Sequence, residues 1–502
     1  MSPNIALNLY SIYIIKKYIS KNIRDDSALD YLMEQINEEY LLILTSLLSK
    51  NNQQLYYDTL YILVNISYTD KGEILFGSNE KIIENIAGFL MNNKDEKNLF
   101  FMGIILIKNI TNKNSIVKNI LIKLNIIQFF NDIYQKYIFD NDIMKNLIIS
   151  LGHFIKSRHG DANILCAIKI IKSQLGTDLP LNLLTEYVYI LFNLSLYNSP
   201  KVYEEMTNND IHKYLMQCFP FDYFNKEENN NINNNSINII EIEKGKGEAF
   251  CNELSLLILK ILGKIMYVQD QKITQKVIDS GISKFLNKVF KIYDIKIIKN
   301  AFFCLSNICS GTYGEIANLY DNDTIYESFK VAKFVYEALD SNNRVINSLI
   351  TSEFIKAFRE INYAISLIII NSLYERLIPF VRNHNYEVVK ILLKGLKVFS
   401  ENDVRGDNDK NLIIYILNAI SKLIEFEKNV DDEEMCSYEV MNFNEFLLKN
   451  GFKEILQKLE MNPNEDIADS AEKISDEYFN DFNQEENKNI NIDDIVEDSN
   501  EE

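Results

Sequence analysis

The chain has 502 residues, 47% of them hydrophobic and 25% charged, so it can bury a large core. Its formal net charge of −19 argues against a general DNA- or RNA-binding protein, because phosphate binding requires an excess of Lys and Arg. The 6 scattered cysteines form neither a disulfide scaffold nor a zinc-site spacing, and no apolar run is long enough to span a bilayer. We therefore expect a soluble protein of a reducing compartment, with no nucleic-acid partner and no membrane insertion.

Helices are predicted throughout, because Pro and Gly are scarce, at 6 and 16 residues, and no β-type alternation persists. Residues 1–30 are predicted to form an N-terminal helix. Residues 31–479 contain apolar helical runs separated by polar connections. Residues 480–502 are acidic and poor in apolar side chains, which predicts a disordered tail.

One frame recurs along residues 31–479: an apolar helical run with a polar residue near its C-terminal end. Four copies carry Asn there: "TLYILVNISY" with Asn65, "MGIILIKNIT" with Asn109, "YVYILFNLSL" with Asn193 and "NAFFCLSNIC" with Asn307. The weaker copies carry His153, Lys264 and Leu367 instead. Most neighbouring positions lie about 40 to 44 residues apart, a period typical of armadillo or HEAT repeats.

Two intervals are wider than this period. Between Asn193 and Lys264 lies "NKEENNNINNNSIN", which predicts a loop insert at about 224–247, since such a polar segment cannot bury a core. Between Asn307 and Leu367 lies "DNDTIYESFKVAKFVYEALDSNN", which we interpret as part of an extended helix pair.

The repeat predicts how the polar residues of the frame are placed in space. A single unit cannot bury its apolar face alone, so neighbouring units stack into a superhelix with a continuous core. One helix of each unit then lines the concave side, and equivalent residues form a row along it. The predicted fold class is an all-α armadillo-repeat solenoid, a right-handed superhelix.

The repeats resemble those of importin-α, the nuclear-import adaptor. "NAFFCLSNICSG" resembles its sixth repeat, whose third helix carries Trp-x-x-x-Asn. "REINYAISL" resembles the seventh repeat, "LLILKILGKIM" the fifth, and residues 444–479 the last. The resemblance covers roughly residues 30 to 480. It implies a non-enzymatic adaptor of cytoplasm and nucleus that binds Lys/Arg-rich nuclear localisation signals of cargo proteins and needs no cofactor.

The resemblance also implies which residues bind the peptide. Asn side chains donate and accept hydrogen bonds, so a row of them can hold a peptide backbone. Aromatic rings four residues earlier form slots for lysine stems, and acids at the slot ends bind the ammonium groups. The implied peptide-binding residues are Asn65, Asn109, Asn193 and Asn307, with the rings of Tyr61, Tyr189, Phe303 and Tyr363 and the carboxylates of Asp270 and Glu360.

The chain departs from the family in several respects. It has no Trp, so Tyr and Phe stand in the ring positions. In the N-terminal half, Lys113 replaces the aspartate that takes the key cargo lysine, and His153 replaces the third Asn. We therefore expect basic peptides to bind in the C-terminal half. Importin-β and an export receptor are further partners in the family, but residues 1–40 hold only four basic residues against six acids.

The alternative is a non-transport armadillo scaffold for protein assembly. In that case the amides cap or stitch neighbouring helices, the aromatic rings are ordinary core, and Asp270 and Glu360 are solvated surface acids. Catalytic motifs of the hydrolase, metalloprotease and P-loop types are missing from the sequence, which favours a binding protein over an enzyme.

Overall fold

The computed structural model describes residues 12–19, 34, 36–49, 53–155, 161–175, 179–224, 240–268, 270–340, 348–383, 386–401, 407–428 and 443–479. The chain divides into two compact units. Unit 1 comprises Met1–Pro220 and Asn233–Ile258, and unit 2 comprises Phe221–Ile232 and Leu259–Glu502. The regular elements of the described residues are all helical, and these residues contain no β-strand.

Unit 1 begins with a short helix over residues 12–19. Its further helices are α3 (Glu38–Leu47), α4 (Gln53–Ser67), α5 (Asp70–Phe76), α6 (Glu80–Asn92), α7 (Lys97–Thr111), α8 (Ser115–Lys123), α9 (Ile126–Ile133) with the 3-10 turn η1 (Tyr134–Tyr137), α10 (Asn141–Ile155), α11 (Asp161–Leu175), α12 (Leu181–Ser195), α13 (Pro200–Asn208) and α14 (Ile211–Gln217). Helix α16 (Ile240–Tyr267) begins in unit 1 and ends in unit 2.

The helices of unit 2 that follow are α17 (Gln271–Asp279), α18 (Ile282–Val289), α19 (Ile295–Cys309), α20 (Tyr313–Asp321), α21 (Thr324–Asp340), α22 (Ser348–Asn371), α23 (Tyr374–Asn383), α24 (Glu387–Glu401), α25 (Asp407–Lys428), α27 (Phe443–Lys449), α28 (Phe452–Glu460) and α29 (Glu465–Tyr478). The wide interval before Leu367 is filled by two long helices, α21 with 17 and α22 with 24 residues.

A recurring backbone feature sets the repeat. The first helix of a repeat is followed by one residue with positive φ, and the second helix of that repeat begins directly after it. Such residues are Asn125 (φ 57), Asp210 (φ 56), Gly281 (φ 89), Asp323 (φ 57) and Gly451 (φ 78). Gly, Asn and Asp adopt this left-handed conformation at the lowest energy, so they turn the chain sharply between two helices.

Helix starts are set by side-chain caps. Asp294 accepts hydrogen bonds from the backbone N–H groups of Lys296 and Ile297 at the start of α19. Thr312 and Glu315 form a reciprocal capping box at α20. Each such cap satisfies N–H groups that the helix itself leaves unpaired, and contributes about 1 kcal/mol.

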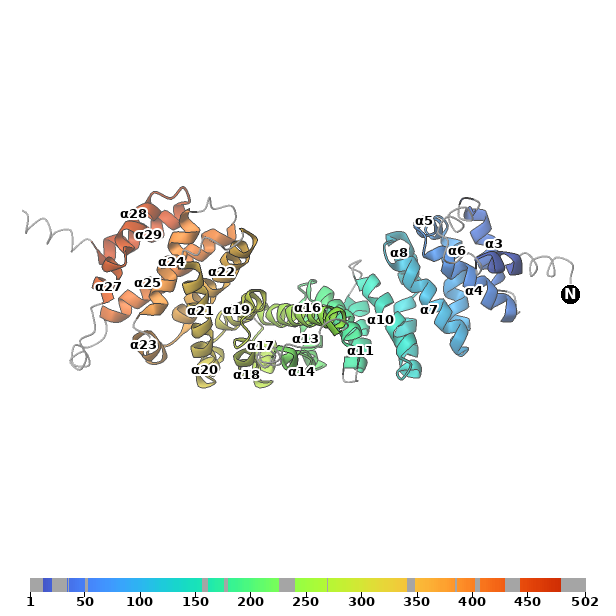
Figure 1. Cartoon of the computed structure of the whole chain (residues 1–502), viewed down its shortest axis with the longest axis horizontal. Helices are drawn as coiled ribbons and strands as arrows, with labels where there is room; N and C mark the ends of the chain where they lie inside the picture. The colour runs from blue at the N-terminus through green and yellow to red at the C-terminus, as the bar shows by residue number, and fades with distance from the viewer. Residues whose placement is uncertain are drawn as a thin grey trace, which may run out of the picture. The chain divides into compact units, whose positions relative to one another are not determined.

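The third helices of the repeats stack against one another within each unit. In unit 1, α7 packs between α4 and α10, and α10 also packs against α12. In unit 2, α22 packs between α19 and α25, and α25 packs against α29 (Figure 1). Their inward faces are fully buried Ile, Leu and Phe, such as Ile104 and Phe302, and each buried side chain of this size contributes roughly 1.5–3 kcal/mol. The opposite face of each third helix is left half-buried.

Helix 12–19 lies within the predicted N-terminal helix of residues 1–30. Helix α16 already begins at Ile240, inside the loop insert predicted at about 224–247. Residues 225–239 and the predicted tail at 480–502 lie outside the described residues.

Candidate functional site

The half-buried faces of α19, α22 and α25 carry a row of aromatic, amide and acidic side chains. We define the unit 2 row as Phe303, Asn307, Glu360, Tyr363 and Tyr415. The Tyr363 and Tyr415 rings lie 5.0 Å apart between centroids. The ring of Phe303 lies against Gly263, where an added Cβ would stand 2.5 Å from the ring. Gly263 is therefore the residue that lets α16 and the Phe303 ring approach each other.

Asn307 joins two helices. Its Nδ2 donates to the carbonyl oxygen of Gly263 at 2.9 Å. Asn371 makes the equivalent contact in the next repeat of unit 2, where its Nδ2 donates to the carbonyl oxygen of Cys309 at 2.9 Å. Cys309 is the last residue of α19, so its carbonyl has no partner inside the helix and the Asn371 amide satisfies it. Gly263 lies one turn before the end of α16, so its carbonyl accepts the Asn307 amide in addition to a helical N–H. Among the described residues, no donor pairs with Asn307 Oδ1, which leaves an acceptor for another chain.

Glu360 is a half-buried carboxylate that forms neither a hydrogen bond nor an ion pair with the described residues. Burial raises the pKa of Glu360, and the positive charges of Arg359 and Lys299 oppose that shift. Both cations are engaged elsewhere. Arg359 Nε lies 2.7 Å from Asp409 Oδ1, and Lys299 Nζ lies 3.6 Å from Glu353 Oε2. Glu360 therefore offers a partly desolvated negative charge to a cation from outside.

Tyr363 is a neighbour of Glu360 on α22. Burial, together with the charges of Tyr415, Glu360 and Tyr267, raises the pKa of Tyr363 to about 12. The phenol is therefore neutral at physiological pH, and its ring face is available for contact with an aliphatic stem or an ammonium group.

Asp270 has a different position from Glu360. It is exposed and caps the N-terminus of α17, where Oδ1 accepts from the backbone N–H groups of Lys272 at 2.9 Å and Ile273 at 3.4 Å. At least one of its oxygens is therefore engaged in holding the helix start. The carboxylate keeps its charge but belongs to the connection before α17, not to the half-buried faces.

The equivalent residues of unit 1 differ from one another in their partners. Asn109 Nδ2 donates to Ser67 Oγ at 2.9 Å and so links α7 to α4. Asn65 and Asn193 instead donate to the carbonyls of their own helices, four residues earlier, at 2.7 and 3.0 Å. His153 continues the linking pattern, with Nδ1 3.2 Å from Thr111 Oγ1.

The ring of Tyr61 in unit 1 already has a lysine beside it. Lys16 Nζ lies 2.6 Å from Asp58 Oδ1 and 5.8 Å from the centroid of the Tyr61 ring. Lys16 is one of the four basic residues of the segment 1–40, and a solvated face of an amphipathic helix is the ordinary interpretation of such lysines. The structure pairs Lys16 with Asp58 of α4 instead. Tyr189, the other predicted ring of unit 1, is exposed on α12.

Comparison with known proteins supports the fold. No protein-family model matches the sequence. No curated protein matches it either. Among solved structures, an engineered protein matches with a TM-score of 0.61 and 14% identity, over 93% of this chain and 94% of its own. A chain from a study of the interaction between cadherin and β-catenin matches with a TM-score of 0.59 and 12% identity, over 89% of this chain and 78% of its own.

The fold is an armadillo-repeat solenoid. A designed armadillo-repeat protein in complex with the peptide (KR)4 also matches, with a TM-score of only 0.38 and 16% identity, over 60% of this chain and 95% of its own. The two matches with TM-scores of 0.61 and 0.59 confirm the fold class that the sequence predicted.

Three residues of the armadillo faces in unit 2 were missed by sequence reasoning: Asn371, Tyr415 and Lys422. A signal for Tyr415 exists, since "LIIYILNAIS" around it resembles "TLYILVNISY" around Tyr61. Asn371 lies one helical turn after Leu367, where the frame was placed, and the added length of α22 hides that register. Lys422 Nζ donates to the carbonyls of Ile370 and Ser372 at 2.7 and 2.8 Å, a role no local pattern indicates.

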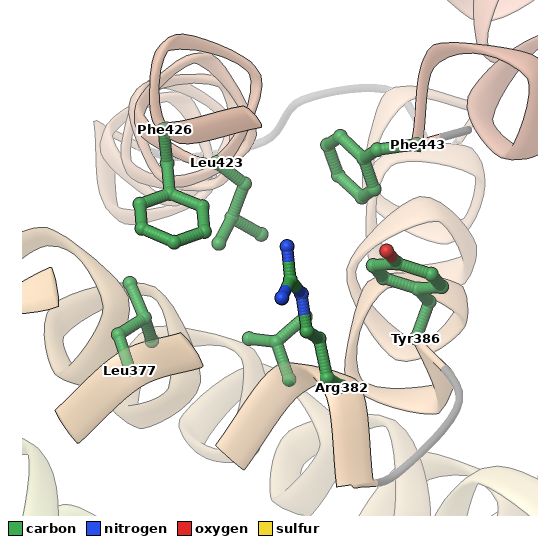
Figure 2. Close-up of a pocket in the computed structure, with 7 residues that line it drawn as sticks. Leu377, Arg382, Tyr386, Leu423, Phe426 and Phe443 are labelled. Carbon is green, nitrogen blue, oxygen red and sulfur yellow. The ribbon is translucent and has the colours of Figure 1, made fainter. Parts of the chain in front are cut away.

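Unit 2 also has one small apolar pocket, drawn in Figure 2. Its lining residues come from α23, from α25, from the residue before α24 and from the first residue of α27. They are Leu377, Val381, Arg382, Tyr386, Leu423, Phe426 and Phe443. The Arg382 side chain points into it in Figure 2. The volume is about 10 Å³, enough for one water molecule, so the pocket is a packing gap and not a ligand site.

Among the described residues, no group of three or more His, Cys, Asp or Glu side chains could hold a metal ion. Within the same part of the chain, no helix is both long and apolar enough to cross a membrane.

Proposed function

We propose that the protein is an importin-α-like adaptor that binds Lys/Arg-rich segments of partner proteins along the unit 2 row, for transport between cytoplasm and nucleus. The observation that carries the proposal is the position of Glu360. Its carboxylate is partly buried, unpaired among the described residues, and beside Tyr363 on α22 and Cys304 on α19, the neighbour of Phe303. A carboxylate that is already partly desolvated favours an incoming cation, because folding has already supplied part of its desolvation energy.

The row also offers the other contacts that a basic segment requires. The rings of Phe303 and Tyr363 can flank the aliphatic stem of a lysine, and a ring face adds about 0.5–2 kcal/mol of cation–π attraction. The free acceptor of Asn307 can take a backbone N–H of an extended peptide. The contacts of a bound lysine would thus be shared between α19 and α22.

Lys16 and Lys422 of the chain itself illustrate such contacts, since each has a tyrosine ring and oxygen acceptors near its ammonium group. Lys16 lies between the Asp58 carboxylate and the Tyr61 ring. Lys422 lies 5.4 Å from the Tyr374 ring centroid while it donates to two carbonyl groups. The first of these contacts places an ammonium group beside a tyrosine ring of the third helix α4, and the second places one beside a ring of α23.

Binding is tested by fluorescence anisotropy of a labelled Lys/Arg-rich peptide across a salt series. We expect micromolar or tighter, salt-sensitive binding by the wild type and at least about ten-fold weaker binding by Glu360→Gln. Glu375→Gln, at an exposed position on α23, removes the same charge and serves as the control. Equal affinities of wild type and Glu360→Gln would refute the proposed site.

Transport is a separate step with its own test. A fluorescent cargo carrying the same peptide is added to permeabilised cells with importin-β and this protein. Nuclear accumulation that depends on Glu360 would support the adaptor. Tight peptide binding without accumulation would leave peptide binding in place and remove the transport role.

A non-transport armadillo scaffold is the second candidate, and specific contacts favour it. Asn65 and Asn193 spend a donor on their own helices, and Lys16 occupies the ring of Tyr61. Unit 1 therefore lacks the uniform row that a two-site cargo adaptor would use. The wild type failing to bind any basic peptide would select this candidate.

A further inference from the structure

A network of three charged side chains, Lys299, Glu353 and Lys356, lies beside the unit 2 row. We call it the Lys–Glu–Lys network. Glu353 Oε1 lies 2.7 Å from Lys356 Nζ on the same helix, α22, and Glu353 Oε2 lies 3.6 Å from Lys299 Nζ on α19. The hydrogen bond from Lys356 lowers the pKa of Glu353, so this carboxylate is charged at neutral pH. One carboxylate thus serves two ammonium groups, and the network has a surplus of one positive charge.

Helix geometry places this network one turn from the row. Lys299 precedes Phe303 by four residues on α19, and Lys356 precedes Glu360 by four residues on α22. Residues four apart share one face of a helix, with their Cβ atoms about 5–6 Å apart. Helices α19 and α22 pack against each other, and the Lys299–Glu353 pair bridges them. A segment that contacts Phe303 and Glu360 therefore also lies beside the network.

The ion pair on the other side of α22 is balanced. Arg359 Nε lies 2.7 Å from Asp409 Oδ1 of α25, and Arg359 Nη2 lies 3.2 Å from Asp409 Oδ2, so one cation has one carboxylate. The surplus positive charge therefore belongs to the side of α22 that faces α19. The Lys356 side chain is 49% exposed, so this charge is accessible to a ligand.

We propose that the unit 2 row selects segments in which an acidic residue stands two positions from the bound lysine. This inference rests on the proposed function, because it takes Glu360 as the partner of that lysine. Alternate side chains of an extended segment point to the same side, about 6–7 Å apart. When a lysine reaches Glu360, the side chain two positions away, toward α19, lies at Lys299 and Lys356. A carboxylate there gives each ammonium group of the network its own charge-assisted partner.

The same position disfavours a further cation. A run of Lys or Arg would place a positive charge against Lys299 and Lys356, and such like charges repel. The expected order of affinity at that position is therefore Glu, then Gln, then Lys. This order narrows the ligand from Lys/Arg-rich segments in general to those in which an acid interrupts the basic residues.

The test is a substitution scan of the labelled Lys/Arg-rich peptide of the binding test, the parent peptide. Each basic residue is replaced in turn by Glu or by Gln, and anisotropy with the full-length protein gives the affinities at near-physiological salt. At one position we expect Glu to bind at least about three-fold tighter than Gln. Lys299→Gln/Lys356→Gln should abolish this advantage. It should also bind the parent peptide as tightly as wild type or tighter, because two repelling charges are removed.

Lys272→Gln/Lys458→Gln is the control, since it removes two exposed lysines from α17 and α28 and changes the net charge equally. It should keep the advantage of Glu. The ion pairs of Glu353 are partly exposed, so thermal unfolding should differ little between the two variants.

The scan distinguishes failure of this inference from failure of the proposed function. Glu360-dependent binding of the parent peptide, with Glu nowhere better than Gln, would overturn the inference alone. An advantage of Glu that persists in Lys299→Gln/Lys356→Gln would do the same. Lack of parent-peptide binding, or binding unaffected by Glu360→Gln, would overturn the proposed function and this inference with it.

Discussion

The half-buried faces of the two units use the same helical frame with opposite chemistry. Asn109 and Asn307 occupy equivalent positions, and each links its third helix to the preceding one. Four residues earlier, unit 1 has Ile105 and unit 2 has Phe303. Unit 1 then adds the unpaired Lys108 and Lys145, whereas unit 2 adds the unpaired Glu360.

This comparison shows which features the armadillo frame dictates and which it leaves free. The amides of Asn109 and Asn307 each donate to a group on the neighbouring helix, a hydroxyl in unit 1 and a backbone carbonyl in unit 2. Both amides therefore contribute to helix packing. The charge of the face is set by a few side chains outside the core, where substitutions leave the fold intact. One solenoid can therefore carry faces of different charge.

The largest expected effect is on the free energy of unfolding, and it should distinguish the core residue Phe302 from its neighbour Phe303 in the unit 2 row. Phe302 is fully buried, so Phe302→Ala should lower the free energy of unfolding by about 3–5 kcal/mol. Phe303→Ile gives unit 2 the residue that unit 1 has at Ile105, and should change stability by less than about 1.5 kcal/mol. Chemical denaturation measures both. Equal destabilisation would show that Phe303 belongs to the core.

Reversing the charge of unit 2 should have the next largest effect. Glu360→Lys replaces attraction by repulsion, so we expect about a hundred-fold loss of basic-peptide affinity. Glu375→Lys carries the same change of net charge at an exposed position on α23 and should stay within about two-fold of wild type. Anisotropy titrations compare the two. A similar loss in both variants would mean that net charge, and not this face, governs binding.

The amides should divide according to their partners. Asn109→Ala and Asn307→Ala each break a bond between helices, so we expect each to destabilise by about 1–2 kcal/mol. Asn193 bonds only its own helix among the described residues, and Asn193→Ala should cost less than about 0.5 kcal/mol. Denaturation midpoints give the ranking. A large effect at Asn193 would contradict the distinction between linking and local amides.

The smallest expected effect is the pH dependence of unit 2. Burial raises the folded-state pKa of Glu360 above its ordinary 4.5, so basic-peptide binding should weaken several-fold as pH falls through that raised value. The same shift means that the folded state binds the proton more tightly than the unfolded state. Protonation therefore stabilises the fold, and that contribution is lost as pH rises through the folded pKa.

Glu360→Gln is the control for this titration. It should bind the basic peptide weakly, with no titration in the pH window above 4.5, and should be at least as stable as wild type at neutral pH. Anisotropy and thermal melts across that window check both parts. An unchanged pH profile in Glu360→Gln would assign the titration to another group.

Much of the fold follows from the sequence because its signals are local. The apolar periodicity of runs such as "TLYILVNISY" predicts helices, and their regular recurrence predicts a solenoid with one polar position per repeat. Gly281 and Gly451 stand where one helix ends and the next begins, because Gly adopts the positive φ of these turns without steric cost.

The sequence by itself thus determined an all-α repeat protein and the places of Asn307, Phe303 and Glu360 on its third helices. Only the tertiary structure decided that Asn307 bonds Gly263 while Asn193 bonds its own helix, and that Lys16 pairs with Asp58. These contacts join residues tens of positions apart. They depend on how far each helix is displaced along its neighbour, which the local pattern does not encode.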